Sequence, residues 1–422
     1  MAFGETTNKS IVLACLYNNE TNCGDKIYVE TFLELMRRYS RDVSVEICDF
    51  YGRVPAEPRQ GDVAAGENIP RKPTLKARIA ALLPRFLQAW VREYSRRKKI
   101  RKYYEKQLLG ADVLIFPGGG LVECPSWRDY YWPMKTLEKI CSRMSIPVVL
   151  NSIGYVENKP SARWFRRWRR ILNNPGVVHV TCRDNLPVFQ ELNERVVQIP
   201  CMACISADVL GVARNDDGSN TVGVGLMRYD CFSDFGNDVG KDFILNYYKD
   251  VIVQLRSLGY NVSLFSVGVK RDQRMGEEIL SIMKEESLSL EGVSIMPRPV
   301  LGRTMLEQMA RFRGILTVRT HSAYTAFSLD IPAVMFYFGK RGWEGKAREF
   351  MAMMGRPENA VCCDGLSPKA LVERFQRAME EGWEQNIRME RKKACYSNFL
   401  AVMDKIGVRQ STESTADIGI FS

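Results

Sequence analysis

The sequence predicts an α/β protein with two domains of similar size that face each other across a cleft. The chain has 422 residues, and a single hydrophobic core stops growing at roughly 250–300 residues. Short apolar runs typical of buried strands alternate with stretches of helical periodicity, and this pattern restarts after a polar, turn-rich segment at residues 212–220. Such alternation is typical of mostly parallel sheets covered by helices on both faces.

The expected strands are bounded by Gly, Pro, Asn or Asp, as in other alternating β and α units. In the first half they lie at residues 10–17, 43–50, 112–119, 147–154, 177–184 and 195–200, and in the second half at 221–229, 261–268, 293–298, 314–321 and 332–340. Residues 240–259 have apolar side chains at helical spacing and end at Gly259, which predicts a helix. We therefore expect an N-terminal domain at 1–211, a linker at 212–220, a C-terminal domain at 221–408 and a flexible tail at 409–422.

Composition indicates an ordinary soluble globular protein, with 45% hydrophobic and 26% charged residues. The polar opening residues do not look like a signal peptide, and no apolar run approaches the roughly 18–20 residues that span a bilayer. We therefore expect a cytoplasmic protein whose twelve cysteines are reduced thiols. Cys201 and Cys204 have the spacing of metal ligands, but no second pair or nearby histidine completes a zinc site. We expect them to be small buried residues.

The net charge of +11 is concentrated in one stretch of the chain. Residues 71–106 contain thirteen Lys or Arg and two Glu, which accounts for the whole surplus. Apolar residues recur there at three- and four-residue spacing, so we expect an amphipathic helix that Pro84 kinks or divides. A second basic segment, residues 163–170, has Trp164 and Trp168 among five arginines. Such segments suit an anionic membrane surface or a phosphate-rich partner, although most basic helices are solvated faces packed on a core.

Ligands of open parallel sheets bind beyond the carboxyl ends of the strands, so the loops that follow strands hold the candidate site residues. In the loop at residues 18–26, Gly24 permits a tight turn and Asp25 can cap the next helix; a turn without a ligand is the alternative. The next such loop has three consecutive glycines, Gly118, Gly119 and Gly120. We expect their N–H groups to approach an anion or a sugar at a helix start. The spacing is neither a Walker loop nor a dinucleotide fingerprint, which counts against an ATPase or a nicotinamide dehydrogenase.

Arg183 and Asp184 close a third strand just before a helix. An arginine at a strand end is well suited to bind a carboxylate or phosphate through two hydrogen bonds. The alternative is a surface ion pair with Asp184, which would contribute little. His179 falls within the strand, where a core histidine with a satisfied hydrogen bond is the better interpretation.

The fourth loop holds the other histidine of the chain, His321. A buried-strand pattern precedes it and a helix of small and apolar residues follows, so Arg319, Thr320 and His321 fall at the strand-to-helix turn. The N–H groups and the positive end of the helix dipole point to this turn. A histidine here can donate or accept a proton near neutral pH, with a capping or packing role as the alternative.

In their order along most of the chain, these loops resemble the motifs of the polysaccharide pyruvyl transferase family. The most specific is an Arg-x-His-Ser element, which matches Arg319, His321 and Ser322. The other matches are Asn-x-Gly-Asp at 22–25, the glycine loop at 118–120, NSIGY at 151–155, Arg-Asp at 183–184 with Asn185 where a serine is common, Ala326, LDIP with Asp330 in the glycine place, and Lys340. One departure is CMACISAD at 201–208, where the family often has Asp-Pro-Ala, so the contribution of this loop to ligand binding is open.

The resemblance implies two Rossmann-like domains in a GT-B-like arrangement, with the acceptor on the N-terminal side and the donor on the C-terminal side. It implies transfer of pyruvate from phosphoenolpyruvate to a hydroxyl pair of a sugar in an exopolysaccharide or cell-wall precursor, which gives a pyruvate ketal and phosphate. Arg183 and Arg319 would neutralise the donor, and His321 would be the general acid. Asp25, the glycine loop, Ser322 and Lys340 are expected to bind substrate. The scheme needs no metal and no further cofactor.

If the acceptor is lipid-linked, the basic segments could bind the enzyme peripherally to the inner membrane, where the acceptor lies. One alternative is a GT-B-type glycosyltransferase that uses a nucleotide sugar in the same cleft. Another is a non-catalytic protein that binds partners through its basic surface. Nucleic acid is not an expected partner, since the sequence has no helix-turn-helix spacing or zinc knuckle. The acceptor sugar and the oligomeric state are open.

Overall fold

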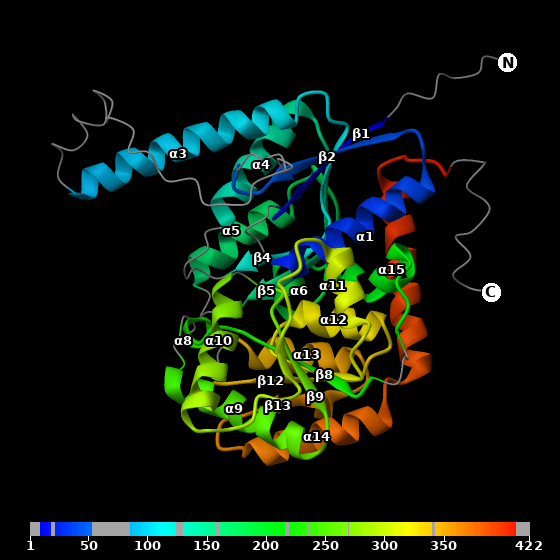
Figure 1. Ribbon diagram of the computed structural model, residues 1–422. Helices are drawn as coiled ribbons and strands as arrows, with labels where there is room; N and C mark the ends of the chain where they lie inside the picture. Colours follow the sequence, from blue (N-terminus) through cyan, green and yellow to red (C-terminus); the bar gives the residue numbers. More distant parts are fainter. Residues whose placement is uncertain are drawn as a thin grey trace, which may run out of the picture.

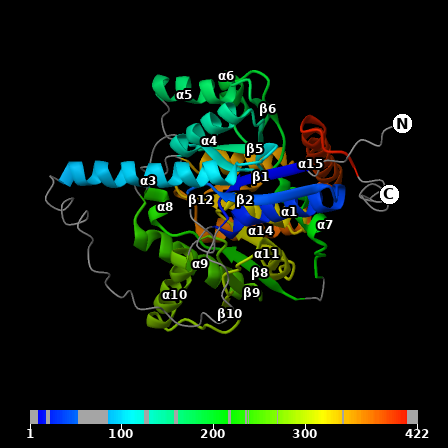
Figure 2. The ribbon, with the colours of Figure 1, turned by 90° about the horizontal axis from the view of Figure 1, so that it is seen from above.

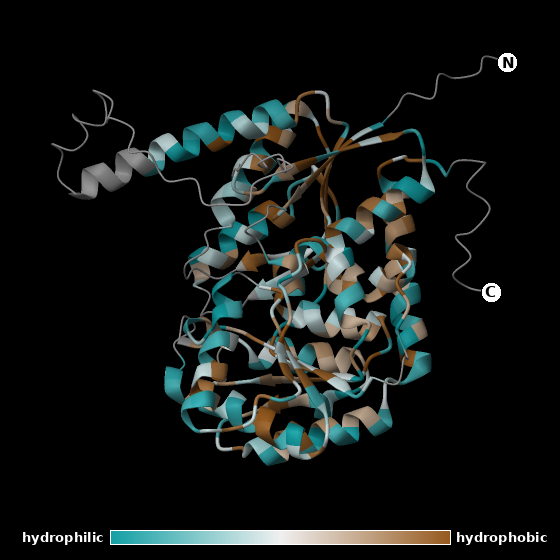
Figure 3. Cartoon of the chain, viewed as in Figure 1, coloured by the Kyte–Doolittle hydropathy of each residue, from teal (hydrophilic) through white to brown (hydrophobic). Residues whose placement is uncertain are grey.

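The computed structural model describes residues 9–17, 22–52, 85–123, 130–156, 161–215, 219–233, 237, 239–268, 270–339 and 342–410. They form two α/β units, each built on one parallel sheet that is covered by helices (Figure 1). The strands of both sheets are largely apolar, while the outward faces of the helices are hydrophilic (Figure 3). This is the pattern expected of parallel sheets buried on both faces.

The first sheet, within the described residues, has seven strands in the order β2-β1-β3-β5-β6-β7, with β4 paired to β5. Its pairs are parallel, and the register places Ile11 of β1 beside Val113 of β3. The strands are β1 (Lys9–Cys15), β2 (Val43–Asp49), β3 (Val113–Phe116), β4 (Gly119–Glu123), β5 (Val148–Val156), β6 (Val177–Cys182) and β7 (Val197–Gln198). The helices are α1 (Cys23–Tyr39), α3 (Arg85–Gln107), α4 (Tyr131–Met144), α5 (Ala162–Leu172), α6 (Leu186–Leu192), η1 (Met202–Ile205) and α7 (Ser206–Leu210).

The second sheet has the order β10-β9-β8-β11-β12-β13 and is also parallel. Its strands are β8 (Thr221–Gly225), β9 (Asn261–Phe265), β10 (Val293–Ile295), β11 (Gly314–Thr317), β12 (Ala333–Tyr337) and β13 (Ala360–Cys362). Its helices are α8 (Asp230–Ser233), α9 (Lys241–Ser257), α10 (Lys270–Glu285), α11 (Gly302–Met309), α12 (Thr320–Ser328), α13 (Glu344–Met353), η2 (Pro357–Asn359), α14 (Pro368–Glu381) and α15 (Gln385–Lys405). Helix α9 corresponds to the helix expected at residues 240–259.

One apolar core continues from the first unit into the second. It includes Phe32 of α1, Ile205 of η1, Phe327 of α12 and Phe399 of α15, all buried. Hydrogen bonds also join the units: the backbone N–H of Cys23 donates to the carbonyl oxygen of Val267 at 2.7 Å. The loops at the carboxyl ends of both sheets therefore meet around the N-terminus of α1.

Helix α15, the last helix of the described chain, returns to the first unit. It contacts η1 and β6, and Lys392 forms an ion pair with Asp208 at 2.7 Å. The buried amide of Asn398 donates to the side-chain oxygen of Asn151 and accepts a hydrogen bond at 3.1 Å from His179. The half-buried His179 thus has the structural role that the sequence predicts for it.

The two basic segments differ in how they pack. Helix α3 begins at Arg85, directly after Pro84, and projects from the body of the molecule (Figures 1 and 2); the expected helical residues 71–84 lie outside the described chain. In α5 the five arginines are exposed, but Trp164 and Trp168 are buried in the core. The buried tryptophans are not available for insertion into a membrane, and α5 presents its arginines to solvent. No helix in the described part of the chain is long and apolar enough to cross a membrane.

Candidate active site

The candidate site lies where the N-terminus of α12 meets the N-terminus of α1. Arg319 is the N-cap residue of α12, and His321 lies in its first turn, as the strand-to-helix prediction expects. Gly24 lies within α1 rather than in a turn, and a Cβ at this position would stand 2.6 Å from the Cβ of His321. The residue that caps α1 is Asn22, whose side chain accepts a hydrogen bond from the N–H of Gly24 at 3.0 Å. The expected cap by Asp25 is wrong, because the helix starts at Cys23 and Asp25 falls inside its first turn.

The imidazole of His321 is contacted on both of its nitrogen atoms. Arg183 Nη1 lies 2.8 Å from Nε2, and Asp25 Oδ1 lies 3.6 Å from Nδ1. The rings of Tyr28 and Tyr324 pack around it, with centroids at 5.5 and 6.5 Å. Burial and the nearby cations Arg183, Lys346 and Arg319 hold the pKa of His321 well below its usual value. In this arrangement the ring is neutral at pH 7.

Arg183 is placed by the end of β6 and by a buried carboxylate. Its Nε donates to Asp184 Oδ2 at 3.2 Å, and Asp184 Oδ1 accepts the backbone N–H of Tyr155 at 2.6 Å. Both charged residues are buried, so the surface-pair interpretation is wrong. Burial alone would lower the pKa of Arg183, but the carboxylate of Asp184 raises it, so the guanidinium stays charged. A side chain at Gly154 would collide with Arg183 Nε at 2.7 Å, and the glycine of the NSIGY motif thereby leaves room for this pair.

Arg319 is held by a carboxylate that the sequence analysis did not identify. Its Nη2 donates to Asp272 of α10, whose side chain is fully buried and also accepts a hydrogen bond at 3.3 Å from Arg228 Nη1. A Cβ at Gly268 would overlap this carboxylate. Arg228 is the second-last residue of the strand expected at 221–229, just as Arg183 is in the strand expected at 177–184, so the same position at a strand end could have indicated it. Nothing in the sequence marks Asp272, because only the fold brings α10 beside the end of β11.

The glycine loop does not begin a helix, and this expectation is wrong. Gly118 and Gly119 have φ angles of +150° and +99°, and the chain continues directly into strand β4. A Cβ at Gly119 would stand 2.6 Å from the hydroxyl of Tyr28, and one at Gly118 would stand 3.2 Å from its ring. The loop therefore lies against the tyrosine that packs on His321. Gly120, which follows in β4, pairs with Gly154 of β5.

The remaining candidates are less well defined. The hydroxyl of Ser322 is buried and has no hydrogen-bond partner among the described residues. Lys340 lies outside the described residues. Cys201 and Cys204 are fully buried around η1, and within the described chain no group of three His, Cys, Asp or Glu side chains could hold a metal ion. Burial raises the pKa of the Cys201 thiol to about 11 although the nearby Arg183 opposes this shift, so Cys201 is a neutral neighbour of the arginine.

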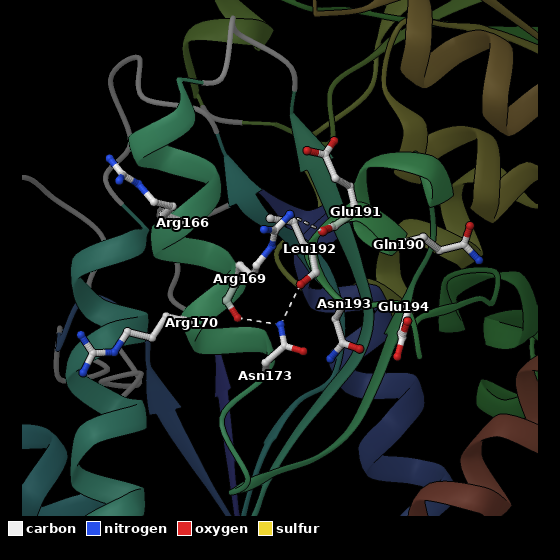
Figure 4. Close-up of a pocket in the computed structure, with 9 residues that line it drawn as sticks. All are labelled: Arg166, Arg169, Arg170, Asn173, Gln190, Glu191, Leu192, Asn193 and Glu194. Carbon is white, nitrogen blue, oxygen red and sulfur yellow. Dashed lines mark hydrogen bonds between the residues drawn. The ribbon is translucent and has the colours of Figure 1, made fainter.

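An open hollow of about 530 Å³ lies apart from these residues, between α5 and α6 (Figure 4). Arg166, Arg169 and Arg170 line one side of it, and Asn173 donates to the carbonyl oxygen of Leu192 at 2.7 Å. None of its lining residues belongs to the His321 cluster.

Comparison with solved structures identifies the class of fold. The chain is similar to the UDP-GlcNAc 2-epimerase of Methanocaldococcus jannaschii in complex with UDP-GlcNAc and UDP, with 12% identity and a TM-score of 0.51 over 93% of this chain and 99% of that chain. It is also similar to a UDP-N-acetylglucosamine 2-epimerase from Listeria monocytogenes, with 7% identity and a TM-score of 0.51 over 96% of each chain. At these identities the likeness shows the fold alone, and the fold is GT-B-like, with two Rossmann-like α/β units as the sequence predicts.

A model of the polysaccharide pyruvyl transferase family matches residues 22–339, most of the chain. The chain belongs to this family. A search of the curated proteins finds no significant match. The matched region contains the His321 cluster and both arginines expected to neutralise the donor.

Proposed function

We propose that the protein transfers pyruvate from phosphoenolpyruvate to a hydroxyl pair of a sugar in an exopolysaccharide or cell-wall precursor. The observation that carries this proposal is the contact between Arg183 and His321, which come from different units and meet at one buried point. Arg319 lies near enough to lower the pKa of the same histidine. Two guanidinium groups beside a proton carrier match a donor with a carboxylate and a phosphate on a protonatable double bond.

The chemistry assigns a step to each side chain. Arg183 and Arg319 neutralise the carboxylate and the phosphate of the donor. His321 gives a proton to C3, which leaves an oxocarbenium-like centre at C2 for attack by the first sugar hydroxyl. The proton of that hydroxyl returns to His321, and the second hydroxyl then displaces phosphate and closes the ketal. The buried hydroxyl of Ser322 is a candidate donor to the phosphate oxygens.

The test is incubation with phosphoenolpyruvate and a panel of lipid-linked or aryl sugars, with phosphate release and product mass as readouts. We expect His321→Gln to lower turnover by about 10²–10⁴-fold, the usual contribution of a general acid. His179→Gln is the matched control, since it removes the other histidine and touches no residue of the site. Normal turnover in His321→Gln would contradict the mechanism. Stabilisation by UDP or ADP but not by phosphoenolpyruvate would favour a nucleotide-sugar glycosyltransferase instead.

We further propose that an anionic membrane surface is a partner, where a lipid-linked acceptor would be met. Support comes from α3, which projects from the body and has a run of exposed cations. These are Arg96, Lys98, Lys99, Arg101, Lys102 and Lys106. Each basic residue near an anionic leaflet contributes about 1 kcal/mol, and salt screens the attraction. Co-sedimentation with phosphatidylserine vesicles should fall when Lys98, Lys99 and Lys102 are changed to Gln, and equal binding to neutral vesicles would refute the idea.

A further inference from the structure

The contact between Arg183 and His321 determines where the histidine keeps its proton. An arginine side chain has only donors, so the N–H of Arg183 Nη1 donates to His321 Nε2 at 2.8 Å. Nε2 is therefore the acceptor, and the single proton of the neutral ring sits on Nδ1, which faces Asp25 Oδ1 at 3.6 Å. In this state the imidazole has no proton at Nε2 that it could transfer to phosphoenolpyruvate.

Charge around the ring also opposes a second proton. The cations that face it are Arg183 at the end of β6, Arg319 at the start of α12 and Lys346 in α13. The neutral phenols of Tyr28 and Tyr324 pack on its sides, and Asp25 in α1 is the carboxylate beside it. An imidazolium here needs further negative charge, and a donor that carries both a carboxylate and a phosphate supplies it.

We propose that the donor itself loads the general acid. In the free enzyme Arg183 donates a hydrogen bond to His321 Nε2. When an anionic donor binds, its carboxylate pairs with Arg183 in place of the histidine, and Nε2 can then take up a proton from solvent. Asp25, whose Oδ1 lies 3.6 Å from Nδ1, is the positioning residue whose negative charge faces Nδ1–H and attracts the resulting imidazolium. This inference rests on the proposed function and adds the order of its first two events.

The proton balance follows from that order. One proton enters from solvent at Nε2 as the donor binds, and it moves to C3 of the donor when the oxocarbenium-like centre forms. The neutral ring then accepts the proton of the attacking hydroxyl at the same nitrogen, which restores the acid. The proton of the second hydroxyl leaves with phosphate. Without bound donor His321 has no proton at Nε2, so water entering the free site meets no general acid.

The chain offers an unusually clean readout, because it has only two histidines. In the His179→Gln variant a ¹⁵N NMR spectrum of labelled imidazole reports His321 alone. Without ligand at pH 7 we expect a neutral ring protonated on Nδ1. Saturating phosphoenolpyruvate should convert it to the doubly protonated form, and calorimetry in two buffers of different ionisation enthalpy should record uptake of about one proton per donor.

The outcomes separate this inference from the proposed function. If phosphoenolpyruvate binds and the ring stays neutral with no proton uptake, donor loading is wrong while the transferase assignment stands. If phosphoenolpyruvate causes neither a thermal shift nor heat of binding, the donor assignment itself fails and this inference fails with it. Inorganic phosphate, which has no carboxylate to take Arg183, should bind with markedly less proton uptake. Equal uptake with phosphate would refute the displacement of Arg183.

Asp25→Asn tests the positioning residue in the same background. It keeps the size of the side chain and removes the charge that pairs with the imidazolium. We expect donor binding to persist and proton uptake to fall, and the alkaline limb of the turnover profile, where the general acid loses its proton, should move to lower pH. Asp25→Glu should restore part of the shift. An unchanged pH profile in a folded Asp25→Asn protein would exclude this role for Asp25.

Discussion

Replacing Gly24 with alanine would test the packing on which the site depends. Gly24 lies in helical backbone, so alanine adds no strain to α1 itself and is favoured there by about 1 kcal/mol. The added Cβ would lie 2.6 Å from the Cβ of His321, 2.8 Å from its Nδ1 and 3.0 Å from its Cγ. The nearest of these atoms is attached directly to the backbone of α12, so a rotamer change of His321 cannot move it away.

The size of the effect follows from this geometry. Carbon atoms pack at about 3.5 Å or more, so α1 and α12 must separate by about 0.9 Å. Overpacking of this kind costs about 1–3 kcal/mol, from which the helix preference of alanine is subtracted. A displacement of about 1 Å in a catalytic group lowers turnover by about 100-fold. We therefore expect a loss of 0 to about 2 kcal/mol in the free energy of unfolding but a large loss of activity.

Urea denaturation and phosphate release from phosphoenolpyruvate measure the two effects. Gly345→Ala is the matched control, because Gly345 also lies in the first turn of a helix, α13, and a Cβ there meets nothing within 4 Å. It should keep full turnover and unfold at equal or slightly higher urea. Wild-type turnover in Gly24→Ala would show that the approach of α1 to His321 is not needed for catalysis.

Three further predictions concern stability. Asp272→Asn removes a fully buried carboxylate partner of Arg319 and should lower the free energy of unfolding by up to about 3–5 kcal/mol; an unchanged urea midpoint would contradict this. Glu30→Gln replaces the carboxylate that accepts the first N–H groups of α11 at 2.9 Å, and it should lower the free energy of unfolding by about 1 kcal/mol. The same urea titration would detect or exclude this loss. Burial lowers the pKa of both His179 and His321, so the unfolded chain binds more protons below about pH 6.5. The free energy of unfolding should therefore fall with decreasing pH by up to about 1.4 kcal/mol per unit for each histidine, and His179→Gln should flatten the slope.

The features that the sequence predicts best are those set by local pattern. Apolar runs bounded by turn residues give the strands, and Arg319 and His321 lie at the strand-to-helix turn that the pattern indicates. Arg183 was found because it ends a strand. Each of these predictions depends on neighbours a few residues away, which is the range over which period and turn chemistry act.

Features that depend on contacts between distant segments were missed. Gly24 reads as a turn residue, but its missing side chain leaves room for His321, almost 300 positions later in the chain. The glycine loop reads as the start of a helix, but the chain continues into strand β4 and a Cβ at Gly118 or Gly119 would meet Tyr28. Asp272 is one acidic residue among many on an amphipathic helix. A sequence pattern cannot show that such residues share a site, because only tertiary packing brings them together.

The return of α15 to the first unit has a consequence for how the chain is made. Asn151 gains its hydrogen bond from Asn398, and η1 its packing partner, only once α15 has been synthesised and has folded back. Those residues are synthesised long after η1, so the first unit emerges from the ribosome well before the helix that packs on it. During that interval the apolar surface around Cys201 is exposed to solvent. We expect the N-terminal half expressed by itself to aggregate, and a separately supplied C-terminal half to rescue it when both are present during synthesis.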